Sequence, residues 1–452
     1  MEFDTLLAIS PVDGRYRKIT EKLNMYFSEF AYIKYRVIVE LKWLKYLLES
    51  KGIIGKDIEI IDIDKYINSF DLNEAKKVKE YERITNHDVK AIEYYVRELF
   101  KGTSLEEYES FVHFGCTSED VNNLAHSLMI NEANKSVLFP MIENLLKILK
   151  EKSFENKSVS MLSHTHGQPA TPTTFGKELA VFIYRIESLY KKMIKIDLKG
   201  KFSGAVGNYN AHVVAYPQVD WIDFTKKFVE ELKIEYNPLS TQIENHDTIC
   251  EIFSYMKLIN NVIMDFNSDM WMYISNKYLK LKVIASETGS SVMPHKVNPI
   301  NFENSMANIR MANCIIDNFT NNLQVSRMQR DLSDSSNLRN MGVTYSHMLI
   351  SLENTIIGIN KIDIDKEILN KDLNNNPEVL SEAIQTVLRK NRHKDAYEQL
   401  KNLTRGKRIT LEQTREYIKE LDITEEDKIN LLKLTPENYI GVAEKLIEFN
   451  DK

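Results

Sequence analysis

The amino-acid sequence predicts an all-α protein with three domains, in which long helices form a central bundle. Only 15 glycines and 10 prolines occur among 452 residues, so long stretches of chain contain neither residue type. Within those stretches apolar residues recur at steps of three and four, which places them on one face of a helix. Strand patterns that alternate with helical ones are absent, and this disfavours a Rossmann or TIM-barrel fold.

The two outer domains are predicted to be helical. In the first, residues 1–106, seven apolar residues from Phe27 to Leu48 follow the helical spacing and mark one long helix. Asp71 and Glu74 have the spacing of a capping box, so we expect a further helix to begin there. In the third, residues 359–452, prolines and glycines separate shorter segments, which indicates a small helical domain.

The second domain, residues 107–358, is predicted to be the bundle of long helices. One helix is expected to begin at Thr117, and another to fill residues 174–197. Residues 239–288 contain neither glycine nor proline, and a helix of roughly forty residues there would be about 60 Å long. Residues 300–341 lack both residue types as well and are predicted to be helical.

Composition and charge exclude several classes of protein. A net charge of -6 gives no footprint for nucleic acid or for an anionic membrane, so any anionic ligand has to be met by local cations. Cys116, Cys250 and Cys314 match neither a zinc nor a disulfide pattern, which favours a reducing compartment. The sequence begins without a signal-like segment, and no uncharged apolar run approaches about 18 residues. We therefore expect a soluble, cytoplasmic protein.

The segment GSSVMPHKVNP, residues 289–299, is the most irregular part of the predicted bundle. It combines a glycine, two serines, two prolines, a histidine, a lysine and an asparagine. A helical scaffold usually keeps its reactive groups at helix ends and in the connections between helices. This loop is therefore a candidate part of a functional site.

His164 and His166 belong to a second irregular segment, SHTHGQPATP, residues 163–172. The glycine and the two prolines indicate a turn-like backbone, so we expect irregular chain to present both imidazoles. Two histidines at this spacing on a strand can share a metal ion, but the segment lacks a strand context and an obvious set of partner ligands. A histidine that transfers protons needs no such partners.

Two further polar segments suggest anion binding. Residues 117–120, TSED, have the pattern of a capping box, and the start of a helix also binds carboxylate or phosphate. The charge run of residues 326–339 is typical of a solvated helix face. Yet Arg330, Ser335 and Arg339 combine two guanidinium groups with a hydroxyl, which suits a phosphate.

Two shorter polar segments lie nearer the N-terminus. Residues 13–16, DGRY, form a predicted glycine turn that presents an arginine and a phenol. Residues 85–88, TNHD, lie within an otherwise helical segment, where a single histidine is more often structural.

These motifs resemble those of the fumarase and aspartase superfamily, whose members remove fumarate from succinyl-type substrates. GSSVMPHKVNP resembles the signature loop of that superfamily, and CTSEDVNNL and THGQPATP resemble its other two shared regions. Within the superfamily the chain is most similar to the bacterial adenylosuccinate lyase family. The similarity is carried by SPVDGRY, YERITNHDVKA, GAVGNYNAH, TQIENHD, VSRMQRDLSDSSNLRN and LTRGKR, and it extends over essentially the whole chain.

The resemblance implies a fold, an assembly and a reaction. It implies an all-helical subunit of three domains, and a homotetramer in which each active site takes residues from three subunits. The implied reaction is the cleavage of adenylosuccinate to AMP and fumarate, and of SAICAR to AICAR and fumarate. Proton transfer and anion stabilisation cover this β-elimination, so we expect no metal and no cofactor. The expected partners are small-molecule substrates and other copies of the chain, without nucleic acid or membrane.

The resemblance also implies roles for individual residues. His166 is the expected general acid toward the departing nitrogen, and Ser290 is the expected general base. A serine is a poor base at its ordinary pKa, so Lys296 and backbone N–H groups have to favour its deprotonated form. Substrate binding is assigned to Arg15, Tyr16, Asn86, His87, Asp88, Thr117, Ser118, Gln242, Ser291, Lys296, Val297, Asn298, Asn304, Arg330, Ser335, Ser336, Asn337, Leu338 and Arg339.

The sequence departs from the family at one position and leaves other functions open. His164 stands where close relatives often have arginine, which makes it a second candidate acid, although His166 matches the Thr-His-Gly-Gln core. Argininosuccinate or aspartate lyase is an alternative, but those substrates carry no phosphate. A metal-dependent amidohydrolase would use both histidines. A non-catalytic scaffold, as in lens proteins, is disfavoured by the presence of Ser290 and His166.

Overall fold

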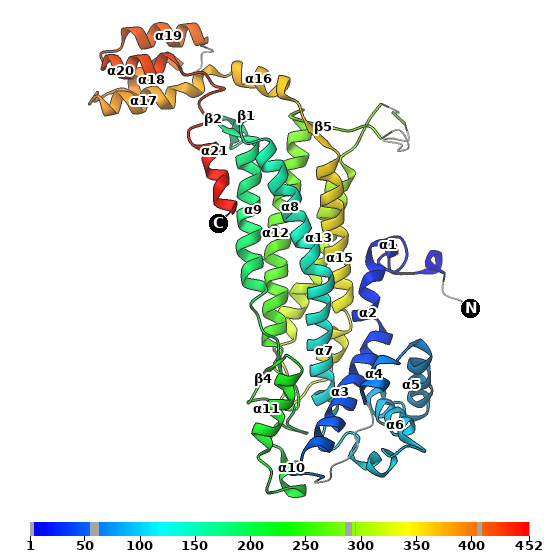
Figure 1. The fold of residues 1–452 in the computed structure, drawn as a ribbon. Helices are drawn as coiled ribbons and strands as arrows, with labels where there is room; N and C mark the ends of the chain where they lie inside the picture. The colour runs from blue at the N-terminus through cyan, green and yellow to red at the C-terminus, as the bar shows by residue number, and fades with distance from the viewer. Residues whose placement is uncertain (1–3, 55–62, 285–291, 294, 405–408, 452) are drawn as a thin grey trace. The chain divides into compact units, whose positions relative to one another are not determined.

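The computed structural model describes residues 4–54, 63–284, 292–293, 295–404 and 409–451 (Figure 1). The described chain is mainly helical, which confirms the predicted all-α class. Its α-helices are α1 (Arg17–Thr20), α2 (Asn24–Phe27), α3 (Glu29–Glu49), α4 (Ile63–Asn68), α5 (Leu72–Thr85), α6 (Asp88–Phe100), α7 (Ser118–Ala133), α8 (Phe139–Glu155), α9 (Phe175–Met193), α10 (Asn210–Ala215), α11 (Trp221–Glu231), α12 (Asp247–Ser275), α13 (Ile300–Asn322), α14 (Ser333–Leu338), α15 (Met341–Asn360), α16 (Lys366–Asn374), α17 (Ser381–Lys390), α18 (Ala396–Thr404), α19 (Leu411–Glu420), α20 (Glu425–Leu432) and α21 (Ala443–Leu446). No helix in this described part of the chain is long and apolar enough to cross a membrane.

Short helical turns and strands complete the described chain. The 3-10 or π-helical turns are Thr5–Leu7, Glu21–Leu23, Glu106–Phe111, Asn134–Leu138, Pro377–Leu380 and Ile447–Asp451. The strands are β1 (Ser160–Thr165), β2 (Gln168–Thr174), β3 (Lys199–Gly200), β4 (Glu235–Tyr236), β5 (Leu279–Leu281) and β6 (Ile362–Ile364). They form the two-stranded sheets β1-β2, β3-β4 and β5-β6, of which only β3-β4 is parallel.

Contacts divide the chain into two compact units, and each is described by itself. Unit 1 comprises Met1–Ile142, Leu189–Asn261 and Ala307–Glu353, and unit 2 comprises Glu143–Ser188, Val262–Met306 and Asn354–Lys452. The boundaries fall within α8, α9, α12, α13 and α15, so five helices contribute residues to both units. The three-domain division at residues 106 and 358 stays a prediction.

Helix α3 occupies the centre of unit 1, because apolar side chains cover more than one of its faces. The predicted face with Val37 packs in a buried cluster with residues of α5 and α6. Trp43, on another face, packs with residues of α7 and α11. The Trp43 ring lies 4.3 Å from the ring of Phe202, and its Nε1 donates to the Phe114 carbonyl at 3.0 Å. A helix that is apolar on several sides belongs in a core.

Side chains fix the starts of several helices as the sequence predicts. Asp71 begins α5 by accepting hydrogen bonds from the N–H groups of Asn73 and Glu74 at 2.8 and 3.0 Å. The Glu74 carboxylate accepts instead from the Tyr95 hydroxyl at 2.8 Å, which ties α5 to α6. Helices α7 and α9 likewise begin close to the predicted positions, at Ser118 and Phe175.

The structure corrects two predicted helices. Residues 239–288 contain α12, which has 29 residues and is about 44 Å long rather than about 60 Å. His246 and Lys277, with φ of 61° and 65°, adopt left-handed backbone on either side of it, which is incompatible with a continuing α-helix. Residues 300–341 likewise form no single helix: they hold α13, α14 and the first residue of α15, because the chain leaves the helical path after Asn322.

Helices α12, α13 and α15 share a buried polar layer within unit 2. The Asn267 amide donates to the hydroxyls of Ser305 and Thr355 at 2.8 and 3.1 Å, and all three side chains are fully buried. The two hydroxyls are 2.8 Å apart, and Thr355 also donates to Asn267 at 3.2 Å. Such a layer favours a single alignment of the three helices, because a shifted helix would leave polar atoms buried without partners.

Thr355→Val should lower the free energy of unfolding by about 1 to 3 kcal/mol, because Asn267 and Ser305 both lose a buried partner. Urea-induced unfolding at one fixed protein concentration measures this change. Thr344→Val on the same helix is the control, since the Thr344 hydroxyl is also buried but, among the described residues, bonds only to the carbonyl of Asn340, which directly precedes the helix, at 3.4 Å. Equal losses in the two variants would contradict the role of the layer.

Candidate functional site

His166 lies at the tip of a β-hairpin in unit 2. Strands β1 and β2 pair antiparallel, and the last pair is Thr165 with Gln168, so His166 and Gly167 form a two-residue turn. Both have left-handed backbone, with φ of 55° and 72°, as a hairpin turn of this length requires. This arrangement leaves His166 exposed.

The hairpin corrects the sequence-based interpretation of His164. That histidine lies on β1, paired with Pro169, whereas irregular chain without a strand context was expected. The turn signals Gly and Pro were recognised, but the strands on either side are too short and too polar to show an alternating pattern. His164 is thus held by a strand, and His166 by the turn that follows it.

The base of the hairpin is anchored to the C-terminal part of unit 2. Glu382 of α17 accepts hydrogen bonds from Thr171 of β2 and from the Tyr439 hydroxyl, the latter at 3.1 Å. The Ser160 hydroxyl donates to the Glu437 carbonyl at 2.7 Å. The hairpin therefore has a fixed base and an exposed turn, which suits a residue that must reach a ligand.

A cavity of about 550 Å³ lies beside the hairpin within unit 2 and includes His164 and Gly167 in its lining. The His164 ring lies 6.1 Å from the ring of Tyr278, another lining residue. The Tyr278 hydroxyl donates to Asp372, and burial together with this carboxylate raises the pKa of Tyr278 above its ordinary value. The pKa of this phenol therefore disfavours a role in proton transfer near neutral pH.

The remaining predicted residues of unit 2 lie around the signature loop. The predicted base, Ser290, and its neighbour Ser291 lie outside the described residues. Lys296 and Val297 are exposed, and Asn298 is half-buried. Asn304, at the start of α13, donates to the Asn354 amide oxygen at 3.4 Å.

Unit 1 contains a chain of buried polar contacts that begins at Arg36. This arginine lies on α3 with a side chain only 1% exposed, and its Nη2 donates to Asp88 at 2.8 Å. Its Nε donates to the Asn122 amide oxygen at 2.8 Å, and its guanidinium lies 3.6 Å from the centre of the Tyr32 ring. The Asn122 amide in turn donates to Glu119 at 2.6 Å. Arg36 thus joins the TNHD and TSED segments.

Glu119 extends the same chain to two more of the predicted segments. Its carboxylate accepts from Arg330 at 3.0 Å, and Arg330 also donates to the Gln242 amide oxygen at 3.2 Å. Gln242 is held further by donating to the Ala205 carbonyl at 3.1 Å. Four segments that are far apart in the sequence therefore meet in unit 1. We call the contacts from Asp88 through Arg36, Asn122, Glu119 and Arg330 to Gln242 the polar chain.

Sequence reasoning missed three members of the polar chain, Arg36, Asn122 and Glu119. The signal for Arg36 is its position: it follows Ile33 by three residues and precedes Val37, so it falls on an apolar helix face. A charge on such a face requires a buried partner. Nothing in the sequence identifies that partner, since Asp88 is 52 residues away.

Asp88 and Arg339 connect the polar chain to a cavity in unit 1. Burial would raise the pKa of Asp88, but the charges of Arg36 and Arg339 and a hydrogen bond from the Val89 N–H lower it below its ordinary value. Arg339 donates to Asp88 at 3.1 Å and to Glu29 at 2.9 Å. It also lines a cavity of about 330 Å³. A negatively charged ligand there would meet Arg339 in competition with two carboxylates.

The other predicted residues of unit 1 lie at helix ends, on α14 or near the N-terminus. Asn86 ends α5 with left-handed backbone, and the His87 ring caps α6 by accepting from the Lys90 N–H at 3.2 Å. These two residues interrupt the helix that the sequence suggested there. Ser335, Ser336, Asn337 and Leu338 lie on α14, where the Leu338 side chain is buried. Arg15 is exposed and Tyr16 is half-buried.

A fully buried ion pair fixes the segment that contains Thr117 and Ser118. Asp120 and Lys201 are 0% exposed, and the Lys201 ammonium lies 2.9 Å from Asp120. Asp120 also accepts from the N–H groups of Thr117, Ser203 and Gly204 at 2.8, 2.8 and 3.1 Å. The carboxylate is therefore fully compensated, and Thr117 and Ser118 are held at the start of α7.

Among the residues that the structure describes, no group of three or more His, Cys, Asp or Glu side chains is arranged to hold a metal ion.

His246 forms a buried pair with Asp334. Its ring lies 3.3 Å from the Asp334 carboxylate, and its side chain is buried. Burial would lower the pKa of His246, but the hydrogen bond with Asp334 and the charges of Glu244 and Glu119 raise it above its ordinary value.

Comparison with known proteins matches the whole chain. A family model described as a lyase matches residues 14–315, and one described as the adenylosuccinate lyase C-terminal region matches residues 326–440. Adenylosuccinate lyases of Buchnera aphidicola subsp. Schizaphis graminum, Legionella pneumophila strain Corby and Escherichia coli K12 are 47%, 48% and 44% identical to it. Each of these alignments covers 99% of both chains.

Solved structures with lower identity share the fold. A fumarate lyase from Mesorhizobium sp. BNC1 has a TM-score of 0.75 at 18% identity and covers 95% of this chain and 97% of its own. A 3-carboxy-cis,cis-muconate lactonizing enzyme from Pseudomonas putida has a TM-score of 0.72 at 16% identity and covers 95% and 96%. At these identities the likeness shows a common fold and nothing about substrate.

The pair of His246 and Asp334 predicts a pH-dependent stability. Because the folded state raises the pKa of His246, the contribution is fully present below the unfolded-state pKa of about 6.5 and is lost as the pH rises through the folded-state value. His246→Asn, which tolerates the left-handed backbone, should therefore lower the melting temperature more at pH 5.5 than at pH 9. A difference between the two proteins that is independent of pH would contradict this assignment.

Proposed function

The chain belongs to the adenylosuccinate lyase family, and from this premise we propose that it cleaves adenylosuccinate to AMP and fumarate, and SAICAR to AICAR and fumarate. The observation that carries this proposal is the match to adenylosuccinate lyases at 44% to 48% identity over 99% of the chain. The chain is thus a lyase, and we place its reaction in the cytoplasm.

The reaction is a β-elimination that moves one proton from carbon to nitrogen. A base removes the proton from the carbon beside a succinyl carboxylate, and the electron pair is held on that carboxylate as an aci-carboxylate dianion. The pair then forms the double bond of fumarate while the C–N bond breaks, and an acid protonates the departing nitrogen. The site therefore needs one base, one acid and cations that stabilise the dianion.

We assign the acid to His166 and the base to Ser290. The exposed position of His166 at the hairpin tip supports its assignment, because an acid must reach the substrate nitrogen. Lys296, in the same loop as Ser290, supplies a positive charge that favours the deprotonated serine and the dianion. Asn298 adds a donor to the same carboxylate.

The start of α7 is proposed to bind a succinyl carboxylate through Thr117 and Ser118. Two acidic side chains in the first turn, Glu119 and Asp120, would otherwise repel such a ligand. Lys201 neutralises Asp120, and Arg330 pairs with Glu119, so the positive end of the helix stays available to an anion. Gln242 lies beside Arg330 and is proposed to contribute an amide.

Phosphate binding is assigned to Arg15, Tyr16, Arg330, Ser335 and Arg339. Arg339 forms ion pairs with the carboxylates of Glu29 and Asp88, so most of its charge is already compensated. Arg15 forms no ion pair in the described part of the chain and therefore offers an uncompensated charge. Arg330 Nε is buried without a hydrogen-bond partner among the described residues, which leaves a donor for a ligand oxygen. Contacts with the rest of the nucleotide are assigned to Asn86, His87, Asp88 and Asn304.

We propose a homotetramer whose active sites combine residues of several subunits. Large apolar side chains on the bundle helices of unit 2 are exposed, among them Val181, Tyr184 and Met272. Monomeric proteins rarely leave such side chains uncovered in groups, whereas a contact with other copies of the chain would bury them.

Fumarate formation, followed by its ultraviolet absorbance, tests the proposed reaction. The wild-type chain should cleave adenylosuccinate and SAICAR but neither argininosuccinate nor aspartate. His166→Ala should slow turnover by about 10²- to 10⁴-fold, because it removes the acid. His164→Ala is the matched control on the same hairpin and should keep most of the activity.

Three outcomes would overturn parts of this proposal. Absence of fumarate from both nucleotide substrates would refute the function, and cleavage of argininosuccinate in their place would identify a different lyase. Near-normal activity of His166→Ala, with a large loss in His164→Ala, would transfer the role of the acid to His164.

A further inference from the structure

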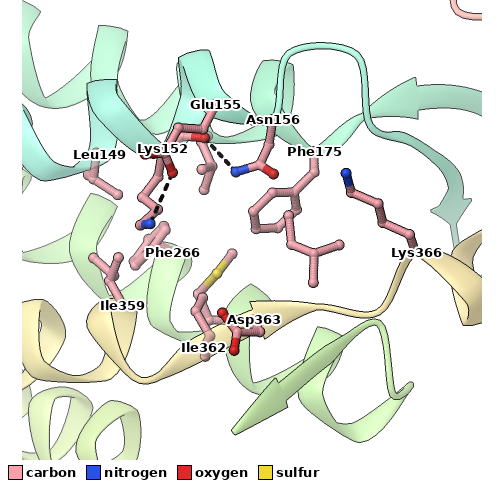
Figure 2. A pocket seen from close by; sticks show the side chains of 13 residues that line it. Leu149, Lys152, Glu155, Asn156, Phe175, Phe266, Ile359, Ile362, Asp363 and Lys366 are labelled. Carbon is pink, nitrogen blue, oxygen red and sulfur yellow. Dashed lines mark hydrogen bonds and ion pairs between the residues drawn. The ribbon is translucent and has the colours of Figure 1, made fainter. Parts of the chain in front are cut away.

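A second cavity in unit 2 contains none of the residues assigned to the reaction. It has a volume of about 330 Å³ and lies among α8, α9, α12, α15 and the β6-α16 segment (Figure 2). Its inner surface is made by buried apolar side chains, namely Leu149, Phe175, Leu179, Phe266, Met270 and Ile359. A cavity of this size and character is typical of a site for a small molecule with an apolar body.

Close packing and hydrogen bonds join α8 and α9 in one wall of the cavity. The Ser153 hydroxyl donates to the Gly176 carbonyl at 2.7 Å, and the Gly176 N–H donates to the Asn156 carbonyl at 3.0 Å. A Cβ atom on Gly176 would lie 2.4 Å from the Ser153 carbonyl oxygen, so the two helices approach as closely as glycine permits. Phe175 and Asn156 therefore have fixed positions in the wall, and binding costs little conformational entropy there.

The charges around the opening leave one cation uncompensated. Lys152 pairs with Glu155 at 3.0 Å, and Asp363 pairs with Lys282 at 3.4 Å, so these four charges cancel. Lys366, the first residue of α16, forms no ion pair with any described residue. Its side chain extends toward Phe175 and Asn156 in Figure 2. The four charged side chains of the lining, Lys152, Glu155, Asp363 and Lys366, sum to zero, and Lys366 is the one that has no ion-pair partner among the described residues.

We propose that this cavity binds a medium-chain carboxylic acid, with its alkyl chain among the buried apolar side chains and its carboxylate on Lys366. The buried apolar side chains favour an alkyl chain, and the Lys366 ammonium, which forms no ion pair with a described residue, can hold one carboxylate at the polar rim. The Asn156 amide lies beside the same opening; its Nδ2 donates to the Lys152 carbonyl at 2.8 Å, and its second N–H can orient the carboxylate. This site is separate from the one that carries the lyase reaction.

Isothermal titration calorimetry of the full chain with octanoate tests the site. Octanoate should bind the wild type, and Lys366→Met should weaken binding by about tenfold or more, because the variant keeps an apolar stem but loses the charge. Lys371→Met, on the same helix but outside this cavity, is the matched control and should bind octanoate like the wild type. Octanol should bind wild type and Lys366→Met equally, and propionate should bind neither.

The opposite results would overturn the proposal. These are no binding of octanoate by the wild type, equal loss of affinity in Lys366→Met and Lys371→Met, or propionate binding as tightly as octanoate. The first shows that the cavity takes no such ligand, the second that Lys366 is not the carboxylate partner, and the third that the apolar floor is not used. Lys366 is an exposed side chain, so its substitution leaves the fold intact.

Discussion

The burial of one guanidinium group organises unit 1 of this protein. A charge with 1% exposure is tolerated only when its partners replace the water that it has lost, and Arg36 has such partners in Asp88, Asn122 and the face of Tyr32. Removing one member of a buried ion pair typically costs about 3 to 5 kcal/mol, because the other charge remains buried. The positions of α6 and α7 against α3 are therefore coupled to this contact.

A second buried pair, Asp120 with Lys201, complements the first. The two acidic residues that open α7 are each compensated by a cation from elsewhere in unit 1, Glu119 by Arg330 and Asp120 by Lys201. Without those cations the first turn would repel a carboxylate, whereas with them the positive end of the helix dipole is not offset by the two acidic side chains. The same contacts that stabilise the fold thus remove the negative charge from the helix start at which we propose that a succinyl carboxylate binds.

The sequence predicted the helices that depend on interactions between residues close to one another in the chain. The helical spacing identified α3 and α9, and side-chain capping located the starts of α5 and α7, because these signals lie within a few residues of one another. The length of α12 was overestimated, since left-handed backbone at His246 and Lys277 ended a helix that no glycine or proline interrupts.

Features that depend on tertiary contacts were harder to predict. The hairpin that carries His164 was missed because a two-stranded sheet of short polar strands is stabilised by its anchor, Glu382, and not by an alternating pattern. The motifs for the site were found, but their connection through Arg36 was not, because a buried ion pair joins residues distant in sequence. Roles such as that of Ser290, outside the described residues, come from the family and stay proposals.

Arg36 is the residue that orders the segments proposed to bind substrate, and the activity of Arg36→Met tests this claim most directly. At a temperature well below the melting point of the variant, kcat/KM for adenylosuccinate should fall at least about tenfold, because the TNHD and TSED segments lose their shared partner. Arg97→Met is the control, since Glu93 of α6 is its one ion-pair partner among the described residues and its side chain is partly exposed. A folded Arg36→Met protein with the wild-type kcat/KM would contradict the claim.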